Sequence, residues 1–422
     1  MLGAVMTRGN RLGRVDMVLL LCVVLLLIFS IVMITNIGVP KSISLTKPAG
    51  SLFPSCGEEG VDCFFLLRRH VVRIGFGLVA FFIGYKIPLR FWRKVAIPLF
   101  ALIIISLVAV LVLGSTSNTF ARAWLVLANT SIQPAEFAKL GLIFYLATWM
   151  ERRGRELGDF RNGFLSFCFV TSLVVFPVLL QPDFGSTLVF AAIATAIYFA
   201  AGARIRHIGL GLLVVFIFTL LVVPSIPYLK YRFTAFLNPS QENCQPAATE
   251  GEALRNYCWQ TEQAQIAIGS GGAFGKGLTQ GIQKSYWLPQ ATDDFIFAAS
   301  AEELGFFRIV FVVVAYMIIA YRGFYIAQQA TDRFAELVAV GITSWIVVQA
   351  FINIGVNIGI MPVTGITLPF ISYGGTSMVS TLGAVGILLQ ISHMSSSPYA
   401  TGLHGRRNRR TRPPQRRHYT TT

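Results

Sequence analysis

Charged residues are scarce in this chain of 422 residues. Only 13% are Asp, Glu, Lys or Arg, whereas 54% are hydrophobic. Soluble proteins average about 25% charged residues, so the composition excludes an ordinary water-soluble domain. Acidic residues are fewer than basic residues, 19 against 35, so the net charge is +16.

Two further features are missing. We find no internal repeat, and this weakens the interpretation as a secondary transporter, because many transporters contain two related halves. No small-x-small cleavage pattern follows the first hydrophobic run, Met17 to Thr35. That run is also longer than a typical signal-peptide core, so we expect a membrane span and not a cleaved signal.

Hydrophobic runs recur along most of the chain. A transmembrane helix needs roughly 20 mostly apolar residues, and the sequence offers about ten such runs. We therefore predict an all-α, polytopic membrane protein with large extracytoplasmic loops. The runs lie at 17–35, 71–88, 95–113, 134–150, 164–180, 187–201, 209–223, 295–321, 334–353 and 377–392.

Basic residues indicate the orientation, because short cytoplasmic loops are enriched in Lys and Arg. They place both termini in the cytoplasm. The predicted parts are an N-terminal segment 1–16, a membrane domain 17–393 and a basic, disordered tail 394–422, with outer loops near 37–70, 114–133, 228–292 and 354–376. We expect the positive charge to attract anionic membrane lipids and no nucleic acid; recognition of nucleic acid or a protein by the tail is the alternative.

Four of the six cysteines fall as pairs in two outer loops: Cys56 with Cys63, and Cys244 with Cys258. Disulfides persist outside the cytoplasm. One bridge within each loop is therefore expected, with free thiols as the alternative.

The longest outer loop contains a glycine-rich run, 269–277, followed by Lys284. Glycines let backbone amides approach a ligand, as in phosphate-binding loops. A flexible linker would show the same composition. An anion-binding loop and a linker are therefore both open at this point.

Asp293 and Asp294 lie where this loop meets an apolar helix. One of them is expected to be the helix N-cap. Two adjacent caps are redundant, and an acid at the membrane boundary is a functional candidate. We therefore expect the other carboxylate to face a cavity as a base or metal ligand.

Glu136 and Lys139 are three residues apart at a predicted helix start, close to Gln133 and Arg122. An i,i+3 ion pair is the simplest reading. Buried in a membrane, such a pair is costly unless it is satisfied or functional, so both roles stay open.

Two outer turns and one irregular segment complete the candidates. Asp183 and Arg232 lie in turns that would be unremarkable alone. The segment 353–376, which includes Ser372, has too many prolines and glycines for a continuous helix. Irregular backbone at membrane depth survives only when it is buried in protein or lines a wet cavity.

These clusters, in this order, closely resemble the SEDS family (shape, elongation, division and sporulation), which contains RodA and FtsW. The strongest matches are NIGVNIGIMPVTGITLPFISYGG, and AIGSGGAFGKGL with QK, LPQATDDFIFA and AEELG. The family's essential aspartate corresponds to Asp294. Gln290, Thr292 and Asp293 depart from the usual family pattern around it.

The resemblance implies a peptidoglycan glycosyltransferase that polymerises lipid II on the outer face of the bacterial cell membrane. The reaction inverts the sugar linkage, for which Asp294 would be the base. Cationic candidates for the departing pyrophosphate are Arg122, Lys139, Arg232, Lys276 and Lys284. We expect further substrate contacts from Gln133, Glu136, Asp183 and Ser372. A divalent cation such as Mg or Mn, bound jointly with phosphate, is possible, and no organic cofactor is expected.

Within the family, Gln283-Lys284 and the turn 232–239 favour the division-type FtsW branch, with elongation-type RodA still open. The resemblance implies a class B penicillin-binding protein (a transpeptidase) as partner, together with other divisome or elongasome proteins, and localisation at the division septum. A lipid II flippase and a non-catalytic scaffold are the alternatives. The hypothesis of a glycosyltransferase predicts that four side chains converge near one outward-open cavity: Asp294, Glu136, Lys139 and Asp183.

Overall fold

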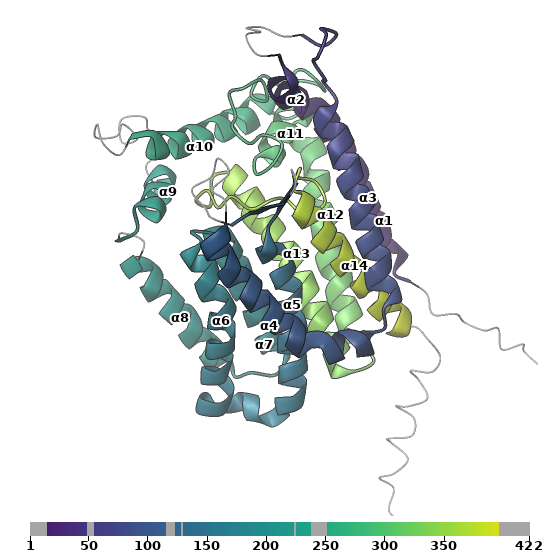
Figure 1. Cartoon of the computed structure of the whole chain (residues 1–422), viewed down its shortest axis with the longest axis vertical. Coiled ribbons are helices and arrows are strands. Elements are labelled where there is room, and N and C mark those ends of the chain that lie inside the picture. Colours follow the sequence, from purple (N-terminus) through teal and green to yellow (C-terminus); the bar gives the residue numbers. More distant parts are fainter. Residues whose placement is uncertain are drawn as a thin grey trace, which may run out of the picture.

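The computed structural model describes residues 15–48, 55–114, 123–127, 130–222, 225–237 and 251–395. The described chain is almost entirely helical, as predicted (Figure 1). Its α-helices are α1 (Met17–Ile37), α2 (Val39–Thr46), α3 (Phe65–Lys86), α4 (Leu89–Leu113), α5 (Pro134–Arg153), α6 (Ser166–Leu180), α7 (Phe184–Ala200), α8 (Ile205–Val222), α9 (Pro227–Leu237), α10 (Gly251–Gly271), α11 (Ile296–Leu304), α12 (Phe306–Gln328), α13 (Arg333–Asn357) and α14 (Gly375–Ser395).

Every predicted hydrophobic run lies on a helix, and the fold is that of a polytopic membrane protein. By length and composition, six helical segments of the described chain could cross a membrane, and α7 is a shorter apolar helix. The single helix expected over 295–321 is wrong. Gly305, at φ 75°, divides it into α11 and α12, because a glycine in this conformation ends a helix without a steric cost.

Three helices expected only as loop sequence, α2, α9 and α10, lie with α11 toward the same end of the molecule in Figure 1. A two-stranded hairpin, β1 (Leu125–Leu127) and β2 (Thr130–Ile132), was likewise not anticipated. The 3-10 helix η1 (Gly154–Gly158) and the π-helix η2 (Phe160–Leu165) lead into α6. Secondary structure thus continues well into the predicted outer loops.

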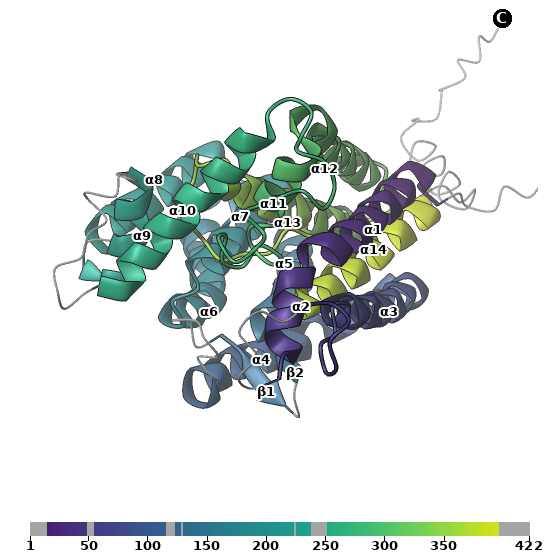
Figure 2. The same ribbon diagram turned by 90° about the horizontal axis from the view of Figure 1, so that it is seen from above.

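Helix α13 lies in the interior of the bundle, where it contacts α5, α7, α12 and α14 (Figure 2). Helices α3 and α14 pack along much of their length. A Cβ atom added to Gly386 would lie 2.1 Å from the carbonyl oxygen of Phe81, so a glycine is required for this approach. Among the candidate spans of the described chain, α13 and α14 are the most buried, and the irregular segment 358–374 joins them.

The structure joins Cys56 and Cys63 by a disulfide. Cys258 is also disulfide-bonded, whereas Cys244 lies outside the described residues. The two cysteines within helices, Cys22 and Cys168, are free thiols.

Candidate active site

Asp293 and Asp294 lie in a turn directly before α11, but neither is its N-cap. The N-cap is Phe295, and it makes no side-chain capping bond. The expectation that one aspartate caps the helix is therefore wrong. The turn closes through its backbone instead, since the amides of Asp293 and Phe295 donate to the carbonyl of Gln290. Both carboxylates remain available for other contacts.

The two carboxylates have different surroundings. Asp293 forms an ion pair with Lys41 at 2.5 Å and accepts a hydrogen bond from the Thr292 hydroxyl at 2.9 Å. Asp294 lies beside Gly365 together with Arg232. A Cβ added to Gly365 would be 3.8 Å from Asp294 Oδ2 and 3.6 Å from Arg232 Nη2. The Asp294 carboxylate and the Arg232 guanidinium therefore both lie close to Gly365.

The electrostatic environment raises the pKa of Asp294 from 3.8 to about 7. Burial, which disfavours the charged form, is the main cause, and the neighbouring Asp293 carboxylate adds to it. Arg232 and Lys41 oppose the rise, while Asp183 contributes slightly to it. A carboxyl group with a pKa near neutrality is suited to accept a proton from substrate.

The backbone around these aspartates is held by two asparagines of α13. Asn353 and Asn357 each donate a side-chain hydrogen bond of 2.9 Å to the carbonyl of Asp294. Asn353 also donates to the carbonyl of Ile366 at 2.8 Å. Ser372, predicted to contact substrate, donates to the carbonyl of Asp293 at 2.6 Å. These bonds attach the acidic turn to the irregular segment 358–374.

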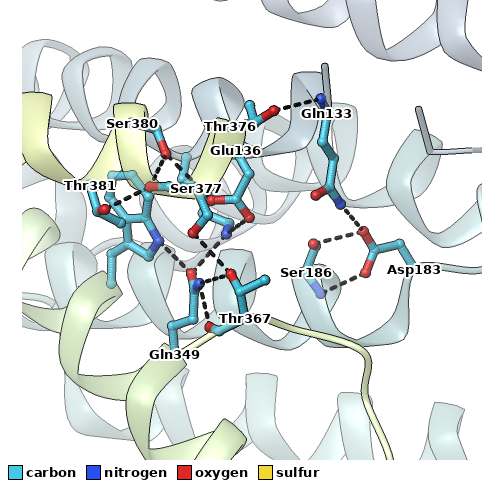
Figure 3. Close-up of polar contacts among 12 residues, drawn as sticks. Gln133, Glu136, Asp183, Ser186, Gln349, Thr367, Thr376, Ser377, Ser380 and Thr381 are labelled. Atoms are coloured by element: carbon cyan, nitrogen blue, oxygen red, sulfur yellow. Dashed lines mark hydrogen bonds and ion pairs between the residues drawn. The ribbon is translucent and has the colours of Figure 1, made fainter. Parts of the chain in front are cut away.

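Glu136 and Lys139 form a buried ion pair of 2.5 Å on α5, with 0% of the Lys139 side chain exposed (Figure 3). Lys139 also donates to Gln349 of α13 at 2.8 Å. Gln349 in turn donates to the carbonyl of Thr367 at 3.0 Å, so the predicted pair supports the same irregular segment. Ser380 of α14 contacts the other oxygen of Glu136 at 3.4 Å.

Asp183 is the N-cap of α7, where it accepts the amide of Ser186 at 2.9 Å. Its other oxygen accepts the side-chain amide of Gln133 at 3.1 Å (Figure 3). Gly185, two residues on, packs against the backbone of Thr364. The start of α7 is thereby placed next to the segment that adjoins Asp294.

Residues 364–367 form a hub for most of the predicted site. Gly185 packs against Thr364, and Asp294 and Arg232 both lie close to Gly365. Asn353 donates to the carbonyl of Ile366, and Gln349 donates to the carbonyl of Thr367. Helices α7, α9 and α13 and the acidic turn thus meet on four consecutive residues. The sequence pattern located these groups separately, and the fold brings them together at one end of the bundle.

Lys276 and Lys284 contact other acids. Lys276 pairs with Glu302 and Lys284 with Glu303, both at 2.7 Å. The carboxylates belong to α11 and are fully buried. The glycine-rich turn serves the same contact, because the amides of Lys276 and Gly277 donate to carbonyls of α11. Arg122 lies outside the described residues.

Two cations near the acidic turn were not among the predicted site residues. Lys41 of α2 pairs with Asp293. Arg73 of α3 stacks 4.0 Å over the Tyr373 ring and donates to the Tyr373 carbonyl at 2.9 Å. Lys41 follows one expected span and Arg73 lies at the start of another, so in the sequence both resemble ordinary boundary residues. Their contacts with positions about 250 to 300 residues away, as the pairs Lys41–Asp293 and Arg73–Tyr373 show, have no local sequence signal.

The fold and the site together define a polytopic membrane protein with an enzyme-like site. At one end of the helix bundle, a carboxyl group with a pKa of about 7 lies near an arginine. A family model for cell cycle proteins of the FtsW, RodA and SpoVE type matches residues 16–397. The chain belongs to this family.

Relatives in the family share about a third of their residues with the chain. A probable peptidoglycan glycosyltransferase FtsW of Geobacter metallireducens is 33% identical over 92% of this chain and 98% of its own length. Stage V sporulation protein E of Bacillus subtilis is 38% identical over 79% and 88%, respectively. The predicted preference for the division-type branch is confirmed by the further relatives named FtsW.

Solved structures agree with the fold. One chain of a peptidoglycan synthase complex, described for its coordination of polymerization and crosslinking, is 27% identical with a TM-score of 0.69, over 90% of this chain and 98% of that chain. The rod shape determining protein RodA of Thermus thermophilus is 28% identical with a TM-score of 0.61, over 90% and 96%.

Proposed function

We propose that this chain is a peptidoglycan glycosyltransferase that polymerises lipid II, with Asp294 as the general base. The observation that carries the proposal is the Asp294 carboxyl, whose pKa is about 7 and which lies beside Arg232 at Gly365. The relatives named as glycosyltransferases, which match over nearly the whole chain, support it.

The residues fit the reaction in the following way. Asp294 accepts the proton of an acceptor sugar hydroxyl while that oxygen attacks the anomeric carbon of the donor. The bond from this carbon to the pyrophosphate breaks, and the electron pair leaves with the lipid pyrophosphate. The Arg232 guanidinium lies close enough to Asp294 to stabilise the departing charge. A positioned base of this kind contributes roughly 10²–10⁴-fold to the rate.

The acids present fit a divalent cation that is shared with substrate. Among the described residues, no group of three or more His, Cys, Asp or Glu side chains could hold a metal ion. Asp293 and Asp294 supply carboxylate oxygens, so the remaining ligands of Mg or Mn would come from phosphate and water, as is common for magnesium. When bound, the ion would neutralise charge on the pyrophosphate. Asp293, paired with Lys41, and Asp294 would hold it.

The partner of this enzyme is proposed from its chemistry. A glycan polymer must be crosslinked, and the structural neighbour in a synthase complex is described as coordinating both activities. We therefore propose a class B penicillin-binding protein as partner and the division septum as the site of action.

The test is polymer formation from lipid II by the purified protein, alone and with its transpeptidase, in the presence and absence of Mg and Mn. Glycan polymer on a gel supports the proposal. Absence of polymer under every condition, combined with movement of lipid II across vesicle membranes, would replace it with the flippase function.

A further inference from the structure

The acidic turn, Thr292 to Asp294, is hydrogen-bonded to a second turn, residues 368–373. This second turn has an unfavourable backbone conformation. Phe370 has φ 66°, a left-handed value that is unfavourable for a residue with a side chain. Such a conformation persists only when its surroundings fix it. The contacts that fix it therefore also fix the acidic turn.

Three different helices donate hydrogen bonds to carbonyls of this second turn. Tyr316 of α12 donates to Pro369, Ser30 of α1 donates to Ile371 at 2.7 Å, and Arg73 of α3 donates to Tyr373 at 2.9 Å. Within the turn, the Ser372 hydroxyl accepts the amide of Leu368 at 2.8 Å. The backbone is thus held at alternate residues by side chains of α1, α3 and α12, which lie on the same side of the bundle in Figure 2.

The second turn is in turn hydrogen-bonded to the backbone of the acidic turn. Ser372 donates to the carbonyl of Asp293 at 2.6 Å, and the amide of Tyr373 donates to the carbonyl of Thr292 at 3.0 Å. The carbonyls of Thr292 and Asp293 are therefore bound by two adjacent residues of the 368–373 turn. A shift at Ile371 would displace both bonds.

His70 of α3 sets the direction of the Ser30 hydroxyl. His70 Nε2 lies 2.7 Å from Ser30 Oγ, and only 1% of His70 and 0% of Ser30 are exposed. Ser30 has one hydrogen and donates it to the Ile371 carbonyl. The contact with His70 therefore requires a proton on Nε2 that His70 donates to Ser30.

We infer that His70 and Ser30 are positioning residues for the general base. They hold the 368–373 turn in place. Ser372 and Tyr373 of that turn in turn fix the backbone next to Asp294. This rests on the proposed function of Asp294 and adds two residues that need not touch substrate.

The kinetic test compares His70→Ala, Ser30→Ala and the double variant in lipid II polymerisation. Loss of this buried hydrogen bond should loosen the 368–373 turn, so kcat should fall about fivefold while KM stays unchanged. The double variant should be no slower than either single variant, because both remove one linked contact. His70→Gln, whose amide nitrogen can take the place of Nε2, should recover most of the loss, whereas His70→Asn should not.

Ile74→Ala is the matched control, since Ile74 is buried on the same helix one turn further along. It should lower thermal stability with little effect on kcat. Equal losses of kcat in Ile74→Ala and His70→Ala, or multiplying effects in the double variant, would overturn the inference.

Amide hydrogen exchange separates this inference from the proposed function. His70→Ala should speed exchange at Ser372 and Tyr373 relative to α7 even in a protein that makes no polymer. Wild-type polymerisation together with unchanged exchange in His70→Ala would overturn the positioning role and leave the proposed function intact. Faster exchange in His70→Ala without any polymer from the wild type would overturn the proposed function, and would leave only the structural link between His70 and the 368–373 turn.

Discussion

Replacement of Lys139 by Met should destabilise the protein strongly. Lys139 is fully buried, pairs with Glu136 at 2.5 Å and donates to Gln349 at 2.8 Å. Its removal leaves the Glu136 carboxylate, 4% exposed, without a counter-charge. Breaking a buried pair by removing one partner costs about 3–5 kcal/mol, a large share of a typical stability of about 5–15 kcal/mol.

The double variant Glu136→Gln/Lys139→Met is the control for this cost. It removes both charges, and Gln349 keeps a hydrogen bond from Trp345 at 2.8 Å, so the loss should shrink to about 1–2 kcal/mol. The assay is denaturant unfolding of purified protein in detergent, followed by intrinsic fluorescence. A single variant within 1 kcal/mol of wild type, or a double variant as unstable as the single, would refute the reasoning.

Two further predictions concern the acidic turn and the glycine-rich turn. Asp294 ionises as the pH rises through its pKa of about 7, so kcat/KM should rise over that range. The Asp293 carboxylate raises this pKa, so Asp293→Asn should shift the rise in kcat/KM to lower pH. A pH profile unchanged by this substitution would contradict the assignment of Asp294 as the base. Gly275→Ala should destabilise the protein, because its Cβ would lie 2.1 Å from the carbonyl oxygen of Glu303, whereas Gly272→Ala, also at positive φ but with nothing within 4 Å, should cost less. Thermal unfolding of the two variants checks this, and equal shifts would argue against a packing role for Gly275.

The membrane helices could be predicted because hydrophobic length is a local property of the sequence. The break at Gly305 could not, since one glycine in an apolar run is compatible with a continuous helix. It ends the helix here because the 271–277 turn packs closely against it: a Cβ on Gly305 would meet the Gly275 amide nitrogen at 2.1 Å.

The candidate site was predictable to the level of its residue types and not of their partners. The sequence located Asp294, Glu136, Lys139 and Asp183 at the ends of expected spans, and the fold connects their neighbours through residues 364–367. Lys276 and Lys284 instead pair with Glu302 and Glu303. Two buried carboxylates need counter-charges, and this requirement appears only once α11 is known to be buried.

The position of Ser372 shows a similar limit. It was predicted to contact substrate, and its hydroxyl donates to the carbonyl of Asp293. A serine in an irregular segment can bind a ligand or the backbone, and the choice depends on which segment lies opposite. Here the opposite segment is the acidic turn.

The most direct test of the central claim compares Asp294→Asn with Asp293→Asn in lipid II polymerisation by the purified protein with its transpeptidase. Both substitutions remove one carboxylate and nearly preserve its size, and both variants should insert and bind the partner. If Asp294 is the base, its Asn variant should form no glycan polymer, while the Asp293 variant, which loses the ion pair with Lys41, should keep measurable synthesis. Polymer from Asp294→Asn at the wild-type rate, or its loss only in Asp293→Asn, would contradict the assignment.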